Sequence, residues 1–163
     1  MGFRKENPMI NQIELISADE VEVSVISWNT LGFRENLTKA IALFASNAGL
    51  HCVFIVDPYN RLLGVITRHD LLNWIRRKLE SFSYYSLSDA DKFIRLRNLI
   101  NSSRAQEVMN PNGCLAAISP NVTLLHALSL MTEFELTVLP VVDGSNRIIG
   151  ARTLSDVLHP ITT

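Results

Sequence analysis

The chain of 163 residues is long enough to bury the core of one domain, and its apolar content of 47% is that of an ordinary globular protein. Its 15 basic and 16 acidic residues nearly cancel, which argues against a nucleic-acid-binding protein, because that class usually carries a basic face. No run approaches the roughly 18 apolar residues of a transmembrane helix, and the polar stretch from Met1 to Pro8 is no signal peptide, so we expect a cytoplasmic protein without a membrane span.

The chain contains two copies of one pattern. Residues 51–72 and 137–158 align without a gap, and the match continues upstream once one residue near Ala48 is dropped. The identical pairs are Val56/Val142, Asp57/Asp143, Asn60/Asn146, Arg61/Arg147, Gly64/Gly150, Thr67/Thr153, Asp70/Asp156 and Leu72/Leu158. Two copies are too few for a solenoid. They predict one compact module with pseudo-twofold symmetry and a cleft between its halves.

Each copy predicts the order strand, helix, hairpin, helix. Asn36 is a typical helix cap, the apolar run 53–56 predicts a strand buried on both faces, and residues 57–61 have the composition of a turn. In the first copy we expect strands at 27–31, 53–56 and 62–66, a helix over 36–47 and a second helix after Thr67. In the second copy we expect strands at 115–118, 138–142 and 148–152 and a helix over 123–133. A helix between the first two strands of each copy predicts a right-handed parallel crossover.

Residues 76–104 have no counterpart in the other copy. We expect an exposed loop over 81–88, followed by a helix that Ser88 and Asp91 cap and that reaches Ile100 with one apolar and one basic side. The simpler interpretation is a linker helix that covers the edge of the module. A helix for a partner protein or a membrane surface is the alternative.

The second copy resembles a cystathionine-β-synthase (CBS) domain in three segments, Leu139–Asp143, Ile149–Asp156 and Glu107–Met109, and the first copy resembles a more divergent one. Together they resemble the tandem CBS pair, or Bateman module. The resemblance implies an extension at 1–16, a first repeat at 17–78, a helical linker at 79–103 and a second repeat at 104–161.

For the fold, the resemblance implies an α/β (α+β) architecture of two β-α-β-β-α repeats with pseudo-twofold symmetry and two clefts. It also implies a homodimer and a ligand that contains adenosine, such as AMP, ADP, ATP or S-adenosylmethionine. Such modules usually regulate an attached domain or a separate partner protein.

Thr67–Asp70 and Thr153–Asp156 lie where a strand ends and a helix begins. By residue pattern, Thr-x-x-Asp is nearly a capping box, in which the hydroxyl and the carboxylate bind N–H groups of the first helical turn. The resemblance adds a ribose-binding role for the two aspartates, because a carboxylate can accept from both ribose hydroxyls. The two roles are compatible, and we include Ser155 in the second site.

Phosphate groups need donors and positive charge. Arg68 and His69 lie at the start of a helix, whose dipole also favours an anion. By resemblance, His51 corresponds to a phosphate-contacting histidine, with a capping or exposed histidine as the alternative. Its counterpart is Thr137, so the two clefts should differ. Arg152 could reach a phosphate, or it could be a surface or dimer-interface charge.

The resemblance assigns the adenine to the first strand of the opposite repeat. This pairs Ala116 with the ribose site of Asp70, and Asn29 with that of Asp156. Ala116 is small enough to leave room for a purine, whereas Asn29 is bulkier.

No catalytic motif is present in the sequence: it has no nucleophile elbow, Walker loop, dinucleotide fingerprint or zincin motif. Cys52 and Cys114 are isolated and predict small buried hydrophobic residues. We therefore expect no enzyme, no metal and no cofactor, but a regulatory module that binds AMP, ADP or ATP and signals to a separate protein. The alternatives are a dimerisation scaffold without ligand and a sensor of S-adenosylmethionine.

Overall fold

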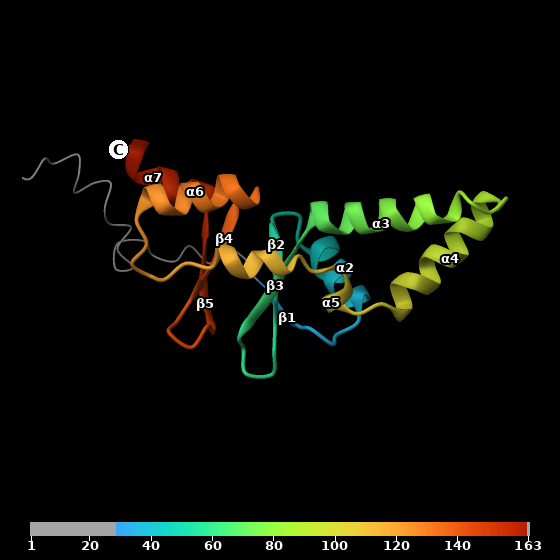
Figure 1. The fold of residues 1–163 in the computed structure, drawn as a ribbon, viewed down its shortest axis with the longest axis horizontal. Coiled ribbons are helices and arrows are strands. Elements are labelled where there is room, and N and C mark those ends of the chain that lie inside the picture. Colours follow the sequence, from blue (N-terminus) through green and yellow to red (C-terminus); the bar gives the residue numbers. More distant parts are fainter. Residues whose placement is uncertain (1–28, 163) are drawn as a thin grey trace, which may run out of the picture. The chain divides into compact units, whose positions relative to one another are not determined.

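The computed structural model describes residues 29–162, which divide after Cys114 into two compact units (Figure 1). We call residues 29–114 the N-terminal unit and residues 115–162 the C-terminal unit, and describe each by itself. The predicted extension at 1–16 lies outside the described residues, as do the first two residues of the predicted strand at 27–31.

The N-terminal unit is built on a sheet with the strand order β1-β2-β3. Its strands are β1 (Asn29–Gly32), β2 (Cys52–Val56) and β3 (Leu62–Thr67). β1 is parallel to β2, and β2 is antiparallel to β3. All five residues of β2 are buried, as its continuous apolar run predicts. The pairing of β1 with β2 confirms the parallel arrangement that was predicted for the first two strands.

The helix between these strands, α2 (Leu37–Ser46), begins and ends as predicted. The side chain of Asn36 accepts a hydrogen bond of 2.9 Å from the N–H of Thr38, which satisfies one of the open donors of the first turn. Its buried residues Leu37, Ala40 and Phe44 repeat at helical spacing and join the core around β2.

A segment that belongs by sequence to the second copy completes the N-terminal unit. The short helix α5 (Ala105–Val108) is tied to it by backbone bonds from Ala105 N to Glu35 O (2.8 Å) and from Gln106 N to Phe33 O (3.1 Å). Two residues later, Asn110 and Val65 exchange backbone hydrogen bonds of 2.8 and 3.2 Å. The compact units therefore part at Cys114, about ten residues after the internal repeat begins.

The end of the first copy and the insert together form a helical hairpin that extends from the sheet (Figure 1). Its helices are α3 (Arg68–Phe82) and α4 (Asp89–Ser102). α3 runs two residues into the predicted loop, because the side chain of Phe82 is buried and keeps the last turn in place. The predicted cap of α4 is confirmed: Ser88 Oγ accepts from the N–H of Asp91 at 3.1 Å and donates to Asp91 Oδ2 at 2.7 Å.

The C-terminal unit contains one antiparallel hairpin between two helices of its core. Its elements are α6 (Leu124–Phe134), β4 (Val138–Val142), β5 (Ile148–Thr153) and α7 (Leu154–Thr162). The side chain of Thr123, where the predicted helix begins, caps α6. Both units are thus mixed α+β structures.

The predicted strand at 115–118 is wrong. Residues Pro111–Ala116 form a 3-10 helix, η1, and only Ile118 forms an isolated parallel bridge, with Val141. The sequence explains the difference, because Pro111, Asn112 and Gly113 favour turns and leave a very short extended stretch before Pro120.

The two hairpin turns share the same hydrogen bonds. Asp57 Oδ1 accepts from the N–H groups of Tyr59 (2.8 Å) and Arg61 (2.9 Å). In the matching turn, Asp143 Oδ1 accepts from the N–H groups of Ser145 (2.8 Å) and Arg147 (3.0 Å). The repeat is therefore preserved at the level of single atoms.

These bonds lower the pKa of both carboxyl groups. Burial tends to raise the pKa of Asp57, but the N–H groups of Arg61 and Tyr59 and the guanidinium of Arg61 together lower it. At Asp143 the N–H groups of Arg147 and Ser145 lower the pKa against a smaller effect of burial.

We expect these turns to make the protein sensitive to acid. A carboxyl group with a lowered pKa in the folded state stabilises the fold fully above its unfolded pKa, about 3.9, and that stability is lost as pH falls through the folded pKa. The free energy of unfolding should fall below about pH 4, and fall less in the double variant Asp57→Asn/Asp143→Asn, since Asn keeps an acceptor but does not titrate. Urea unfolding at pH 7 and pH 3 measures the difference. The control is Glu133→Gln, which removes an exposed carboxyl group of α6. If the free energy of unfolding falls as much in the double variant as in this control, the prediction is wrong.

We expect the matching positions Gly64 and Gly150 to respond differently to substitution by alanine. A Cβ on Gly64 would lie 2.9 Å from Asn110 O, whereas the nearest atom to a Cβ on Gly150 is 3.9 Å away. Gly64→Ala should therefore lower the free energy of unfolding by about 1–3 kcal/mol, and Gly150→Ala should leave it within about 0.5 kcal/mol or raise it slightly. Urea unfolding of both variants tests the prediction, and equal effects would argue against the close approach at Asn110.

Candidate functional site

The junction of β3 and α3 is held by the predicted capping box. Asp70 Oδ2 accepts from the N–H of Thr67 at 2.7 Å and from its hydroxyl at 2.8 Å, while Thr67 Oγ1 accepts from the N–H of Asp70 at 3.1 Å. These bonds satisfy donors at the start of the helix. Two of these bonds are accepted by Asp70 Oδ2 and the third by Thr67 Oγ1. Asp70 Oδ1 takes part in none of the three.

The junction of β5 and α7 repeats this arrangement. Asp156 Oδ2 accepts from the N–H of Thr153 at 2.9 Å, and Thr153 Oγ1 accepts from the N–H of Asp156 at 3.2 Å. Thr153 is buried, Asp156 is half-buried and Ser155 is exposed. The structural role that the residue pattern predicted is confirmed in both copies.

A hollow of about 350 Å³ lies beside Asp70 in the N-terminal unit. One wall is α3 and the other is the chain that leads from α5 into η1. The lining residues are Asp70, Asn73, Arg76 and Arg77 from α3, and Val108, Met109, Asn110 and Pro111 from the opposite wall. We call it the α3 hollow.

The α3 hollow is polar and carries a net positive charge, since two arginines face one aspartate. Asp70, Asn73 and Arg77 stand at positions i, i+3 and i+7, so they lie along one face of the helix. Arg76 is 3.7 Å from Glu80, and both side chains are mostly exposed, which makes this a weak ion pair.

Arg68 does not line the α3 hollow. Its Nη2 donates to the carbonyl oxygens of Phe44 (3.1 Å) and Asn47 (3.0 Å), and its guanidinium lies 4.9 Å from the centre of the Phe44 ring. A cation at these carbonyls satisfies the last turn of α2 and complements its dipole. In the structure Arg68 links the start of α3 to the end of α2, and its predicted phosphate contact stays a prediction.

The other predicted residues are distributed over the two units. His51 and His69 are exposed in the N-terminal unit, where Asn29 begins β1 opposite Val53. In the C-terminal unit Thr137 is exposed, whereas Ala116 and Arg152 are buried. The predicted pairings of Ala116 with Asp70 and of Asn29 with Asp156 join residues of different units, and they stay predictions.

Sequence reasoning missed Asn73, Arg76, Arg77 and Asn110 as site residues. The signal for Asn73 and Arg77 was present, because helical spacing from Asp70 points to the residues three and seven positions later. Arg76, six positions after Asp70, is outside this spacing. Asn110 carried no such signal, since its place in the hollow depends on the backbone pairing with Val65.

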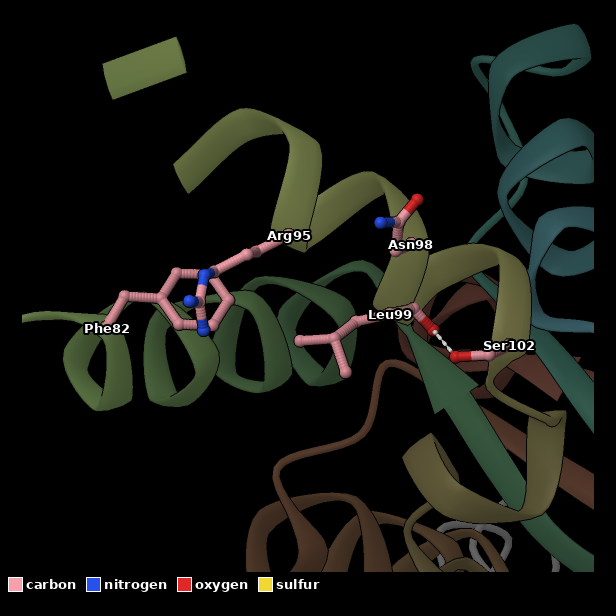
Figure 2. Close-up of a pocket in the computed structure, with 5 residues that line it drawn as sticks. All are labelled: Phe82, Arg95, Asn98, Leu99 and Ser102. Carbon is pink, nitrogen blue, oxygen red and sulfur yellow. Dashed lines mark hydrogen bonds between the residues drawn. The ribbon is translucent and has the colours of Figure 1, made fainter. Parts of the chain in front are cut away.

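A second hollow, of about 400 Å³, lies between α3 and α4 (Figure 2). It is lined by Phe82, Arg95, Asn98, Leu99 and Ser102. Figure 2 shows Leu99 pointing from α4 toward α3, with Phe82 at the end of α3 and Arg95 reaching toward it. None of the residues predicted for ligand binding lies in this hollow.

Neither cysteine is placed for metal or nucleophilic chemistry. Burial, and to a smaller extent the charge of Asp70, raises the pKa of the Cys52 thiol to about 12, and burial also raises the pKa of Cys114. Within residues 29–162, no group of three His, Cys, Asp or Glu side chains is placed to bind a metal ion. No helix in this range combines the length and apolar character needed to cross a bilayer.

Comparison with known proteins gives one matching family. The model described as CBS domain matches residues 30–77 and 105–162. Among curated proteins, homoserine O-acetyltransferase of Methanococcus vannielii is 27% identical over 99% of this chain and 29% of its own length. Arabinose 5-phosphate isomerase KdsD of Francisella tularensis is 33% identical over 76% of this chain and 31% of its own length. The chain thus spans about three tenths of these relatives.

Solved structures share the fold at low identity. The cytosolic domain of the Mg²⁺ channel MgtE in complex with ATP has a TM-score of 0.56 and 22% identity, over 81% of this chain and 44% of that one. CBSX2 in complex with AMP has a TM-score of 0.58 and 21% identity, over 82% and 87%. The CBS domain pair of MJ0100 in complex with 5′-methylthioadenosine and S-adenosylmethionine has a TM-score of 0.59 and 18% identity, over 83% and 92%.

We expect Arg68 to act on stability and not on ligand binding. Arg68→Ala removes the bonds to Phe44 O and Asn47 O and should lower the free energy of unfolding by about 1–2 kcal/mol. In a titration with ATP the variant should respond as the wild type does, because Arg68 does not line the α3 hollow. Urea unfolding and calorimetric titration measure both quantities, with Arg97→Ala on the exposed side of α4 as control. A response to ATP that the variant loses at unchanged stability would support the predicted phosphate contact of Arg68.

Proposed function

Because the chain belongs to the CBS domain family and carries two copies of that domain, we propose that it is a regulatory module that binds AMP, ADP or ATP. The observation that carries this proposal is the α3 hollow, where a carboxylate at a helix start and two arginines line one polar cavity. A nucleotide presents hydroxyl donors and an anionic tail, which match these two kinds of group. The AMP and ATP complexes of CBS structures with the same fold support the choice of ligand.

In this proposal Asp70 binds the ribose. The carboxylate can accept about four hydrogen bonds, and the capping bonds fall on Oδ2. Oδ1 is therefore the atom that we assign to the ribose hydroxyls. The helix cap positions this carboxylate before the ligand arrives, so binding does not have to order it.

The charge of the hollow separates nucleotides from S-adenosylmethionine. The sulfonium of S-adenosylmethionine is a cation, and Arg76 and Arg77 would repel it, whereas they attract a phosphate. We therefore rank AMP, ADP and ATP above S-adenosylmethionine for this hollow.

Regulation requires that occupancy change the population of two states, since a ligand acts only through its different affinity for them. We propose that the module works as a homodimer in the cytoplasm and passes this change to a separate partner protein, with residues 79–103 as the linker between repeats 17–78 and 104–161. Since the chain spans about three tenths of its curated relatives, the enzymatic activities of those relatives are not carried over to it.

Thermal unfolding with and without millimolar AMP, ADP, ATP or S-adenosylmethionine tests the proposal. A ligand at 100 times its dissociation constant adds about 2.7 kcal/mol, which raises Tm by roughly 5–10 °C for a chain of this size. Asp70→Asn keeps an acceptor for the cap but loses the charge, so it should fold and lose most of this shift.

Asp91→Asn is the matched control, because Asp91 occupies the same position in the capping box of α4, away from the hollow. It should respond to the ligand as the wild type does. The absence of any shift in the wild type would refute nucleotide binding and favour a dimerisation scaffold. An equal loss of response in both variants would show that the cap, and not the ribose contact, was responsible.

A further inference from the structure

The cations of the α3 hollow lie beyond the ribose site along the helix. Asp70 and Arg77 are seven residues apart on one face of α3, which corresponds to a rise of about 10 Å. A single phosphate on the ribose would stay close to Asp70. A chain of two or three phosphates that runs along α3 would reach the arginines.

The two arginines differ in how they are held. Within residues 29–162 three ion pairs are shorter than 4.0 Å, and Arg77 takes part in none of them. Arg76 belongs to one, with Glu80 at 3.7 Å, and the side chains are 64% and 65% exposed. Such an exposed pair contributes little, so a phosphate can replace Glu80 at low cost. Arg68, by contrast, is held by the carbonyl groups of α2.

These cations occur in one copy only. At the offset of 86 residues that aligns Asp70 with Asp156, Arg76 and Arg77 correspond to Thr162 and Thr163. The carboxylate and its cap are therefore common to both copies, whereas the paired cations belong to the first.

We propose that Arg76 and Arg77 bind the terminal phosphates of the ligand and make the α3 hollow selective for ATP and ADP over AMP and adenosine. The proposal rests on the nucleotide-binding function above and adds the part of the ligand that this site reads. Asn73 and Asn110 line the space between the ribose and the arginines with amide groups. Arginine suits this task, because its planar donors match phosphate oxygens and it stays charged at any physiological pH.

Calorimetric titration with adenosine, AMP, ADP and ATP, in EDTA to exclude Mg²⁺, tests the selectivity. The wild type should bind ATP and ADP more tightly than AMP. Arg77→Ala and the double variant Arg76→Ala/Arg77→Ala should weaken ATP binding roughly tenfold or more. Their affinity for adenosine should stay within about twofold of wild type, since adenosine carries no charge for the arginines to bind.

Glu80→Gln provides a change in the opposite direction. It removes the carboxylate that competes for Arg76 and should strengthen ATP binding by roughly two- to threefold, with no effect on adenosine. Arg95→Ala is the matched control, because Arg95 also lies on the helical hairpin but lines the other hollow (Figure 2). It should bind all four ligands as the wild type does.

The outcomes separate this inference from the proposed function. If the wild type binds AMP as tightly as ATP, or if Arg77→Ala leaves ATP binding unchanged, the selectivity is refuted while nucleotide binding stands. If Arg77→Ala weakens adenosine and ATP equally, the arginine has a structural role and the inference also fails. If the wild type binds none of the four, the proposed function fails and the inference with it.

Discussion

The backbone pairing between Val65 and Asn110 is the contact on which the site depends. It brings residues 108–111 onto β3, and α3 begins three residues after Val65. Both walls of the α3 hollow are therefore anchored to one strand. The approach needs a glycine on each side, since a Cβ on Gly64 would meet Asn110 O at 2.9 Å and one on Gly113 would meet Val65 Cγ2 at 2.6 Å. Two small residues thus allow a segment from the second copy to form a wall for the first.

Much of the fold could be predicted because local chemistry decides it. Asn36 and Ser88 begin helices in the structure where their side chains predicted a start, since a capping bond needs only a neighbouring N–H group. The hairpin turns could also be predicted, because Asp57 and Asp143 bind backbone groups two and four residues away. All of these interactions join residues that are only a few positions apart in the sequence.

The strand expected at 115–118 is absent for a local reason, since Pro111, Asn112 and Gly113 favour turns and form the start of η1. Other features depend on contacts distant in sequence. The guanidinium of Arg68, whose phosphate role stays a prediction, binds carbonyl groups 21 and 24 residues earlier. The wall at Asn110 could not be predicted, because it depends on the backbone pairing with Val65. Sequence reasoning therefore found the carboxylate of the site but not the groups around it.

The position of α3 suggests how occupancy could matter beyond the hollow. This helix of 15 residues, about 22 Å long, contributes Asp70 and Arg77 to one hollow and Phe82 to the other. A ligand can influence a distant surface only through an element that has two arrangements and that the ligand biases. α3 is the element that contacts both hollows, and its first turn is held by the carboxylate that we assign to the ribose. A nucleotide that contacts both Asp70 and Arg77 would stabilise two turns of this helix. A change in the conformation of the hairpin of α3 and α4 is therefore the first effect of binding to look for.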